Sequence, residues 1–102
     1  MDKKIAPVFR TEAIQKINEK HKGNDAETQA NRSLEALQVF FSLTTQDLRQ
    51  DLDIMHPAGR IKELRRRGFN IQTHWENYPT ASGKLHRMGR YVYMGREGDG
   101  HE

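Results

Sequence analysis

Apolar residues repeat every three to four positions through the middle of the chain and every second position near its end. The first repeat is typical of a helix with one buried face, and the second of a strand. Residues 32–42 place Leu34, Leu37 and Phe41 three and four positions apart, which predicts a helix. This helix can begin as early as Ala26.

Residues 43–52 carry a helix-start pattern that has a physical cause. Thr44 suits the N-cap position, and Asp47 follows at the spacing that closes a capping box. Leu43 before the cap and Leu48 after it are spaced for a hydrophobic staple. We therefore predict a helix of about two turns directly after Thr44.

A third helix is predicted over residues 57–67. Pro57 suits its first position because the missing N–H has no partner there. Ile61 and Leu64 share a face with Pro57 and are expected to be buried. Gly68 suits the position after the helix, and the three arginines before it favour the helix dipole. We expect a short basic helix with one apolar face.

After the third helix the apolar repeat changes to two. In residues 69–76, Ile71 and Trp75 alternate with polar residues, which predicts a strand. Residues 77–89 are rich in Pro, Gly, Ser and Asn, and this composition predicts a loop. Residues 90–94 form a second predicted strand. The two strands are expected to pair as a hairpin with a long basic loop at its tip.

The first 26 residues are expected to form an N-terminal arm or accessory helix. Thr11 can cap a short helix that Gly23 ends, and Ile14 and Ile17 give that helix a narrow apolar strip. A helix of this length does not persist alone, so it must dock on the domain, dock on a partner chain, or fray. Its apolar strip makes it the candidate segment for homodimer formation.

The predicted elements follow the order helix, short helix, basic helix and basic hairpin. This order is the α+β plan of a winged helix-turn-helix: a three-helix core plus a β-hairpin wing. We place this domain at residues 27–95 and a disordered tail at 96–102. The third helix, about 10–12 Å across, matches the roughly 12 Å major groove of DNA. The predicted core comprises Leu34, Leu37, Phe41, Leu48, Leu52, Ile54, Ile61, Leu64, Ile71 and either Tyr91 or Val92.

The net charge of +3 at pH 7 conceals an asymmetry along the chain. Residues 1–55 carry eight Lys and Arg against nine Asp and Glu, a net charge of −1. Residues 56–96 carry nine Lys and Arg against two Glu, a net charge of +7. A block this basic favours a polyanionic partner. The alternative is a solvated basic face on an ordinary domain.

Several classes of function are excluded by composition and spacing. The chain has no cysteine, so it has no disulfide, cysteine-ligated zinc or thiol nucleophile. Its five histidines lack metal-ligand spacing and no serine lies in a nucleophile pattern, so we predict no metal, no cofactor and no enzymatic activity. No apolar run approaches the roughly 20 residues of a membrane span, and no apolar secretory segment follows the basic start. We expect a cytoplasmic protein that does not bind membranes.

The segment 43–76 also resembles a known family, the small helix-turn-helix domain of phage and prophage proteins. The shared hallmark is an Ile- and Arg-containing pattern that ends in a glycine and an isoleucine. In this chain it consists of Leu52, Ile54, Arg60, Ile61, Leu64, Arg65, Gly68 and Ile71. The resemblance extends over about residues 32–94 and leaves residues 1–26 uncovered. It implies a winged helix fold, DNA binding and a phage or prophage origin, with no enzymatic activity and no cofactor.

Candidate DNA contacts lie on the third helix, at the start of the second helix and in the wing. They are Gln46, His56, Ala58, Gly59, Arg60, Lys62, Glu63, Arg66, Arg67, Lys84, Arg87 and Arg90. Arg60 is the best placed to donate twice to a guanine, although it can instead pair with Asp47 or Asp51. Lys62 and Arg66 are expected to meet phosphate.

Other residues have competing interpretations. Arg65 lies near the core side of the third helix, where a structural ion pair competes with DNA contact. Trp75 can stack on single-stranded nucleic acid, but its strand spacing favours the core. The wing loop can grip the DNA backbone or the minor groove, or it can be a mobile, solvated loop.

The sequence favours a double-stranded DNA-binding protein, specifically a transcriptional regulator. An excisionase-like architectural protein uses similar chemistry, a protein-interaction winged helix is a rival from another class, and RNA binding is a third option. The acids Asp47, Asp51 and Asp53 discriminate between them. If they share a face with Arg60 and Arg66, the DNA hypothesis weakens; if they lie behind that face or neutralise Arg65, it survives.

Overall fold

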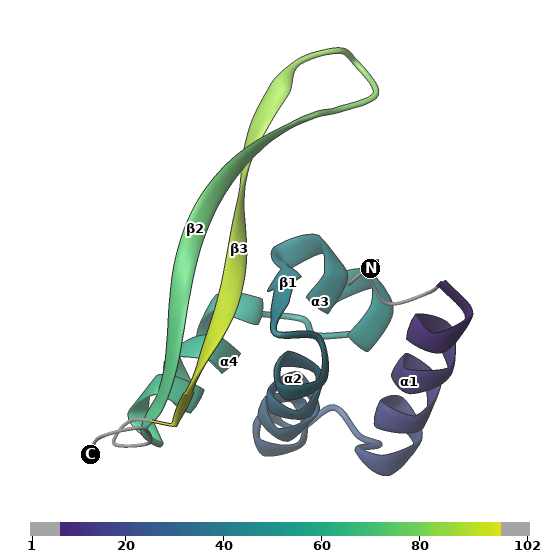
Figure 1. The fold of residues 1–102 in the computed structure, drawn as a ribbon, viewed down its shortest axis with the longest axis vertical. Helices are drawn as coiled ribbons and strands as arrows, with labels where there is room; N and C mark the ends of the chain where they lie inside the picture. Colours follow the sequence, from purple (N-terminus) through teal and green to yellow (C-terminus); the bar gives the residue numbers. More distant parts are fainter. Residues whose placement is uncertain (1–6, 97–102) are drawn as a thin grey trace, which may run out of the picture.

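The computed structural model describes residues 7–96, which form four helices and a three-stranded antiparallel sheet (Figure 1). The strand order is β1-β3-β2. The helices cluster together, and the long β2–β3 hairpin, called the wing below, projects beyond them (Figure 1). The elements are α1 (Pro7–Lys20), α2 (Ala26–Phe40), β1 (Ser42–Thr44), α3 (Thr45–Leu52), α4 (Pro57–Arg66), β2 (Phe69–Pro79) and β3 (Leu85–Arg96).

The capping box predicted for α3 is present. The Thr44 hydroxyl accepts from the Asp47 N–H at 3.0 Å, and Asp47 Oδ2 accepts from the Thr44 N–H at 2.9 Å. Leu43 and Leu48, the predicted staple pair, are both buried. Strand β1 was not predicted, because three residues that also form a cap and a staple are too short to show a strand repeat. It pairs with residues 90–92 of β3.

Helix α4 has the predicted start and ends one residue earlier than predicted. Pro57 occupies its first turn and is buried. His56 precedes it and makes no side-chain capping hydrogen bond. Arg67 is the C-cap residue, and Gly68 follows with φ of 98°, a conformation that glycine adopts without strain. The chain then enters β2 directly, which fixes α4 against the base of the wing.

The buried core matches most of the predicted set. It comprises Ile17, Ala30, Ala36, Leu37, Leu43, Leu48, Leu52, Ile54, Ile61, Leu64, Ile71 and Tyr91. Tyr91 is the buried member of the Tyr91/Val92 pair, and Leu34 is partly buried. The prediction for Phe41 was wrong, because its side chain is 63% exposed. Phe41 is the C-cap of α2 with φ of 68°, so the helical repeat no longer governs where its side chain points.

Helix α1 is longer than predicted and packs on the other helices. It begins at Pro7, before the expected Thr11 cap, so the described part of the first 26 residues contains a docked accessory helix. Ile17 is 2% exposed and belongs to the core. This side chain is therefore occupied within its own chain, whereas the homodimer hypothesis required it to contact a second one. Asn18 Nδ2 also donates to the Asp51 carbonyl at 3.0 Å, which ties α1 to α3.

A buried arginine on α2 joins three parts of the helical core. The Arg32 guanidinium donates to the Leu52 and Asp53 carbonyls at the end of α3, at 2.7 and 3.2 Å. It also donates to the His21 and Gly23 carbonyls after α1, at 2.6 and 3.0 Å. One side chain thus satisfies backbone acceptors that helix ends leave without intrahelical partners.

The predicted hairpin is confirmed, but its predicted loop at 77–89 was wrong. The strands pair as far as Pro79 with Leu85, so the connection is only residues 80–84. Pro79 is tolerated because it ends a strand at the sheet edge. The composition of these residues favours turns, so the sequence pattern did not indicate strands. Cross-strand pairing nevertheless stabilises the strand conformation here. At the other end, Arg96 belongs to β3, and the rest of the predicted tail lies outside the described residues.

Candidate nucleic-acid interface

The exposed side of α4 carries cations that the rest of the described chain does not neutralise. Lys62 and Arg66 are exposed and form no ion pair within residues 7–96. Arg65, between them in the basic run, is used differently. Its Nε donates to the Ile71 carbonyl at 2.8 Å and its Nη2 to Thr73 Oγ1 at 2.9 Å. Arg65 therefore anchors α4 to β2 through hydrogen bonds, whereas the structural interpretation expected an ion pair.

Arg60 is turned inward and paired along its own helix. Its side chain is 16% exposed, and its Nη2 lies 3.1 Å from Glu63 Oε2. Neither Asp47 nor Asp51, the partners considered from sequence, contacts it. Its Nε is buried without a hydrogen-bond partner among the described residues. A contact from Arg60 to a base would require the Glu63 carboxylate to release the guanidinium.

Both ends of α4 are accessible, but they differ in their hydrogen bonds. At its start His56 and Ala58 are exposed and Gly59 is partly buried. At its end Arg67 is exposed and donates to Asn31 Oδ1 of α2 at 3.0 Å. The candidate residues of α4 that are exposed without such a bond are therefore at its start and on the face of Lys62 and Arg66.

The acids of α3 lie on the side that α1 covers. Arg10 Nη2 of α1 is 3.1 Å from Asp51 Oδ2 and 3.6 Å from Asp47 Oδ1. Asp53 caps the end of α3 and contributes its carbonyl to Arg32. The carboxylates of Asp47 and Asp51 thus share one cation of α1, a helix that lies on the opposite side of the molecule from α4 (Figure 1).

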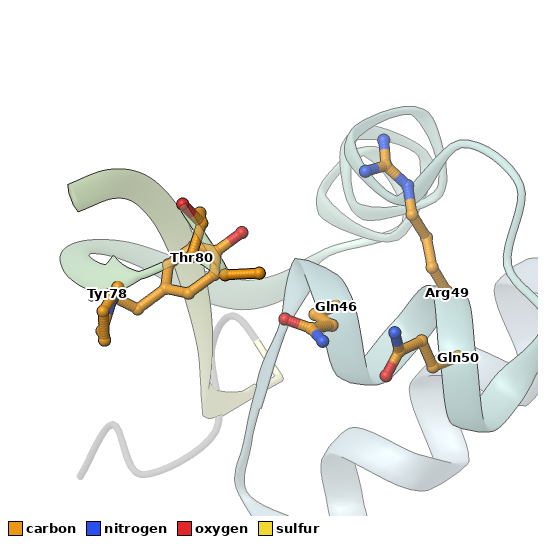
Figure 2. Close-up of a pocket in the computed structure, with 7 residues that line it drawn as sticks. Gln46, Arg49, Gln50, Tyr78 and Thr80 are labelled. Carbon is orange, nitrogen blue, oxygen red and sulfur yellow. The ribbon is translucent and has the colours of Figure 1, made fainter. Parts of the chain in front are cut away.

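A groove of about 470 Å³ lies between α3 and the wing. Figure 2 shows its α3 side, formed by Gln46, Arg49 and Gln50, and its wing side, with Tyr78 and Thr80. Gln46 was a candidate from sequence, whereas the other residues were missed. Residues 46, 49 and 50 are three and four positions apart, so they share a helix face that Asp47 and Asp51 do not share. This spacing could have identified Arg49 and Gln50 from the sequence. Tyr78 could not be found because it was predicted to lie in the loop, whereas it belongs to β2.

The wing presents two arginines in contrasting states. Arg90 Nε lies 2.6 Å from Glu76 Oε2, and its Nη1 donates to Ser42 Oγ of β1 at 3.0 Å. Arg87 instead lies with its Cζ 4.6 Å from the centre of the Trp75 ring. Trp75 is 62% exposed, so the prediction that it belongs to the core was wrong. Trp75 pairs with Gly89 of β3 near the start of α3, and most of its side chain stays uncovered there.

The surface from α4 to the wing is therefore strongly cationic. Both acids of residues 56–96 are bonded internally, Glu63 to Arg60 and Glu76 to Arg90. The side chains left exposed and without an ion pair, among residues 7–96, include Lys62, Arg66, Lys84, Arg87 and Arg96. Arg96 lies over the Phe69 ring at 5.2 Å.

Residues 7–96 contain no group of three or more His, Asp or Glu side chains that could hold a metal ion. None of the helices within 7–96 is long and apolar enough to cross a membrane.

A helix-turn-helix pair, α3 and α4, followed by a cationic β-hairpin defines a class of DNA-binding folds. A family model described as "Winged helix-turn-helix domain" matches residues 28–96, and the chain belongs to this family. The match begins within α2 and leaves α1 outside it. No curated protein and no solved structure shows a significant match to the chain. Family membership indicates DNA binding in general terms.

Proposed function

We propose that the protein binds double-stranded DNA with a sequence preference and acts as a transcriptional regulator of a phage or prophage. Helix α4 enters the major groove, and the wing contacts the flanking backbone or minor groove. The family assignment supports DNA binding, and the hallmark pattern from Leu52 to Ile71 supports the phage or prophage origin.

The separation of charge on α3 and α4 is the observation that carries this proposal. Asp47 and Asp51 are paired with Arg10 on the α1 side, while Lys62 and Arg66 stay exposed on α4. Carboxylates beside the DNA would repel phosphate, so their placement and pairing favour DNA over the protein-interaction alternative. For Asp47 and Asp51, this is the placement under which the DNA hypothesis survives.

Binding energy would come mainly from phosphate contacts. Lys62 and Arg66 flank the major groove when α4 lies in it, and Gln46 and Arg49 are placed to meet the backbone beside the wing groove. Each cation that neutralises a phosphate releases counterions, so affinity should fall steeply with added salt.

Base reading would come from the accessible start of α4. His56 and Ala58 are exposed there, and Gly59 adds no side chain that would keep the backbone away from base edges. Arg60 forms an ion pair with Glu63. It would contact a base only after that ion pair breaks, so we assign the first base contacts to the start of α4.

The test compares DNA binding by matched double variants. Fluorescence anisotropy of a labelled mixed-sequence duplex would be followed with rising protein at several salt concentrations. Lys62→Gln/Arg66→Gln removes two cations from α4, and the control Lys16→Gln/Lys22→Gln removes two from α1 and the turn after it. We expect the first pair to weaken binding and to reduce the salt slope by about 2, and the control to leave the slope unchanged. Equal effects of the two pairs, with both variants folded, would contradict the proposal.

A further inference from the structure

The wing carries a large aromatic side chain where no packing requires one. Trp75 is the only tryptophan of the chain, and its side chain is 62% exposed. A single exposed apolar side chain is ordinary on a protein surface, so the informative feature is the cation that lies against this ring. The cation is Arg87, 4.6 Å from the ring centre.

Contacts along the hairpin show which way Trp75 faces. Side chains two apart on a strand share a face, so Trp75 lies on the side of Thr73, whose hydroxyl accepts from Arg65 of α4. Opposite Trp75 in the pairing is Gly89, whose carbonyl accepts from Thr45 Oγ1 at 3.4 Å. A Cβ built on Gly89 would stand 3.6 Å from Trp75 Cζ3 and 3.6 Å from Thr45 Oγ1. The indole therefore lies on the α4 side of the wing, close to the start of α3.

Arg87 differs from the other wing arginine in what holds it. Arg90 is held by the Glu76 carboxylate, which cancels its charge. Arg87 has no carboxylate partner within residues 7–96 and lies against the face of an indole. An aromatic ring restrains a guanidinium without neutralising it, and the planar cation keeps its donors available. Such an arginine is preorganised for an external anion.

We propose that Trp75 is a positioning residue that holds Arg87 ready to bind a DNA phosphate beside the groove between α3 and the wing. The inference rests on the proposed function and deepens it, since it names how one phosphate contact is preorganised. Arg87 makes the contact, and Trp75 acts through Arg87.

The test is a double-mutant cycle in the full chain. Trp75→Leu, Trp75→Phe, Arg87→Gln and Trp75→Leu/Arg87→Gln would be titrated into the same labelled duplex at several salt concentrations. We expect Arg87→Gln to lower affinity about tenfold, as for one charge-assisted hydrogen bond, and to reduce the salt slope by about 1. Trp75→Leu should lower affinity by less than Arg87→Gln does, and Trp75→Phe should lower it least. The affinity of the double variant should equal that of Arg87→Gln.

The alternatives give different results. If Trp75→Leu weakens binding equally in the Arg87→Gln background, Trp75 touches DNA itself or only supports the hairpin, and the inference is overturned. If Trp75→Leu binds like the wild type, it is overturned as well. Failure of the wild-type chain to bind the duplex would overturn the proposed function first. Thermal unfolding of each variant separates a folding defect from a binding defect.

Discussion

The helical core and the wing differ in how their arginines are bonded. In the core, Arg32 donates to four backbone carbonyls and Arg10 bridges two aspartates of α3. In the wing, Arg87 lies on an exposed indole, and Leu85 is 69% exposed. These arginines of the helices bond to acceptors within the chain. In the wing, Arg87 and the apolar side chains beside it are exposed to solvent.

This contrast gives a way to sort the arginines. Those bonded to carbonyl or carboxylate oxygens, such as Arg32, Arg65 and Arg90, hold elements of the fold together. Those without such an oxygen partner among the described residues, such as Arg66 and Arg87, are available to an external anion. Position on a basic helix or strand does not separate the two kinds, because Arg65 and Arg66 are neighbours.

The largest expected effect is in the core, from Arg32→Met. The variant leaves four carbonyls at the junction of α1, α2 and α3 without their donor, and the hydrogen bond to the Leu52 carbonyl is fully buried. We expect the free energy of unfolding to fall by about 3 kcal/mol, measured by urea denaturation. A loss below about 1 kcal/mol would show that water replaces the guanidinium as donor. The fold would then not depend on the four hydrogen bonds of Arg32.

A smaller effect is expected from Arg90→Gln at the base of the wing. The change removes the ion pair with Glu76 and the hydrogen bond to Ser42, so the free energy of unfolding should fall by about 1 kcal/mol. The salt slope of DNA binding should stay near that of the wild type, because this guanidinium is already neutralised. If Arg90→Gln reduced the salt slope as much as Arg87→Gln does, both arginines would contact phosphate, and the distinction between them would be wrong.

The smallest expected effect is a pH dependence between α1 and α2. His21 Nε2 lies 2.7 Å from Glu35 Oε1, and this hydrogen bond, helped by Lys20, lowers the pKa of Glu35 below its usual 4.5. A carboxyl with a lowered folded pKa stabilises the fold fully above pH 4.5 and loses that contribution as the pH falls through the folded value. The stability difference between wild type and Glu35→Gln should therefore be present at pH 4.5 and shrink as the pH falls below that value. A difference that grows as the pH falls below 4.5 would contradict this assignment.

The helical part of the fold could be predicted because its signals are local. The spacing of Leu34 and Leu37, the Thr44–Asp47 capping box and Pro57 at the start of α4 all act within a few residues. The failures come from non-local effects. Phe41 leaves the core because the chain turns left-handed there, and the strands extend through a loop-like composition because they pair with each other.

The candidate site was predictable only in part, for the same reason. The cationic character of α4 is visible in the sequence, and Lys62 and Arg66 are exposed as expected. Whether an arginine is bonded internally depends on residues far along the chain, as with Arg90 and Ser42. The groove residues Arg49 and Tyr78 come together only when the wing folds beside α3.

The most direct test of the central claim is to map the DNA-binding surface by NMR. Amide chemical shifts of the labelled protein would be followed while a mixed-sequence duplex is added. We predict the largest changes at the start of α4, in residues 46–50 of α3 and between Trp75 and Arg87 of the wing, with α1 nearly unchanged. Changes centred on α1, or none at a DNA concentration that saturates the anisotropy signal, would contradict the account.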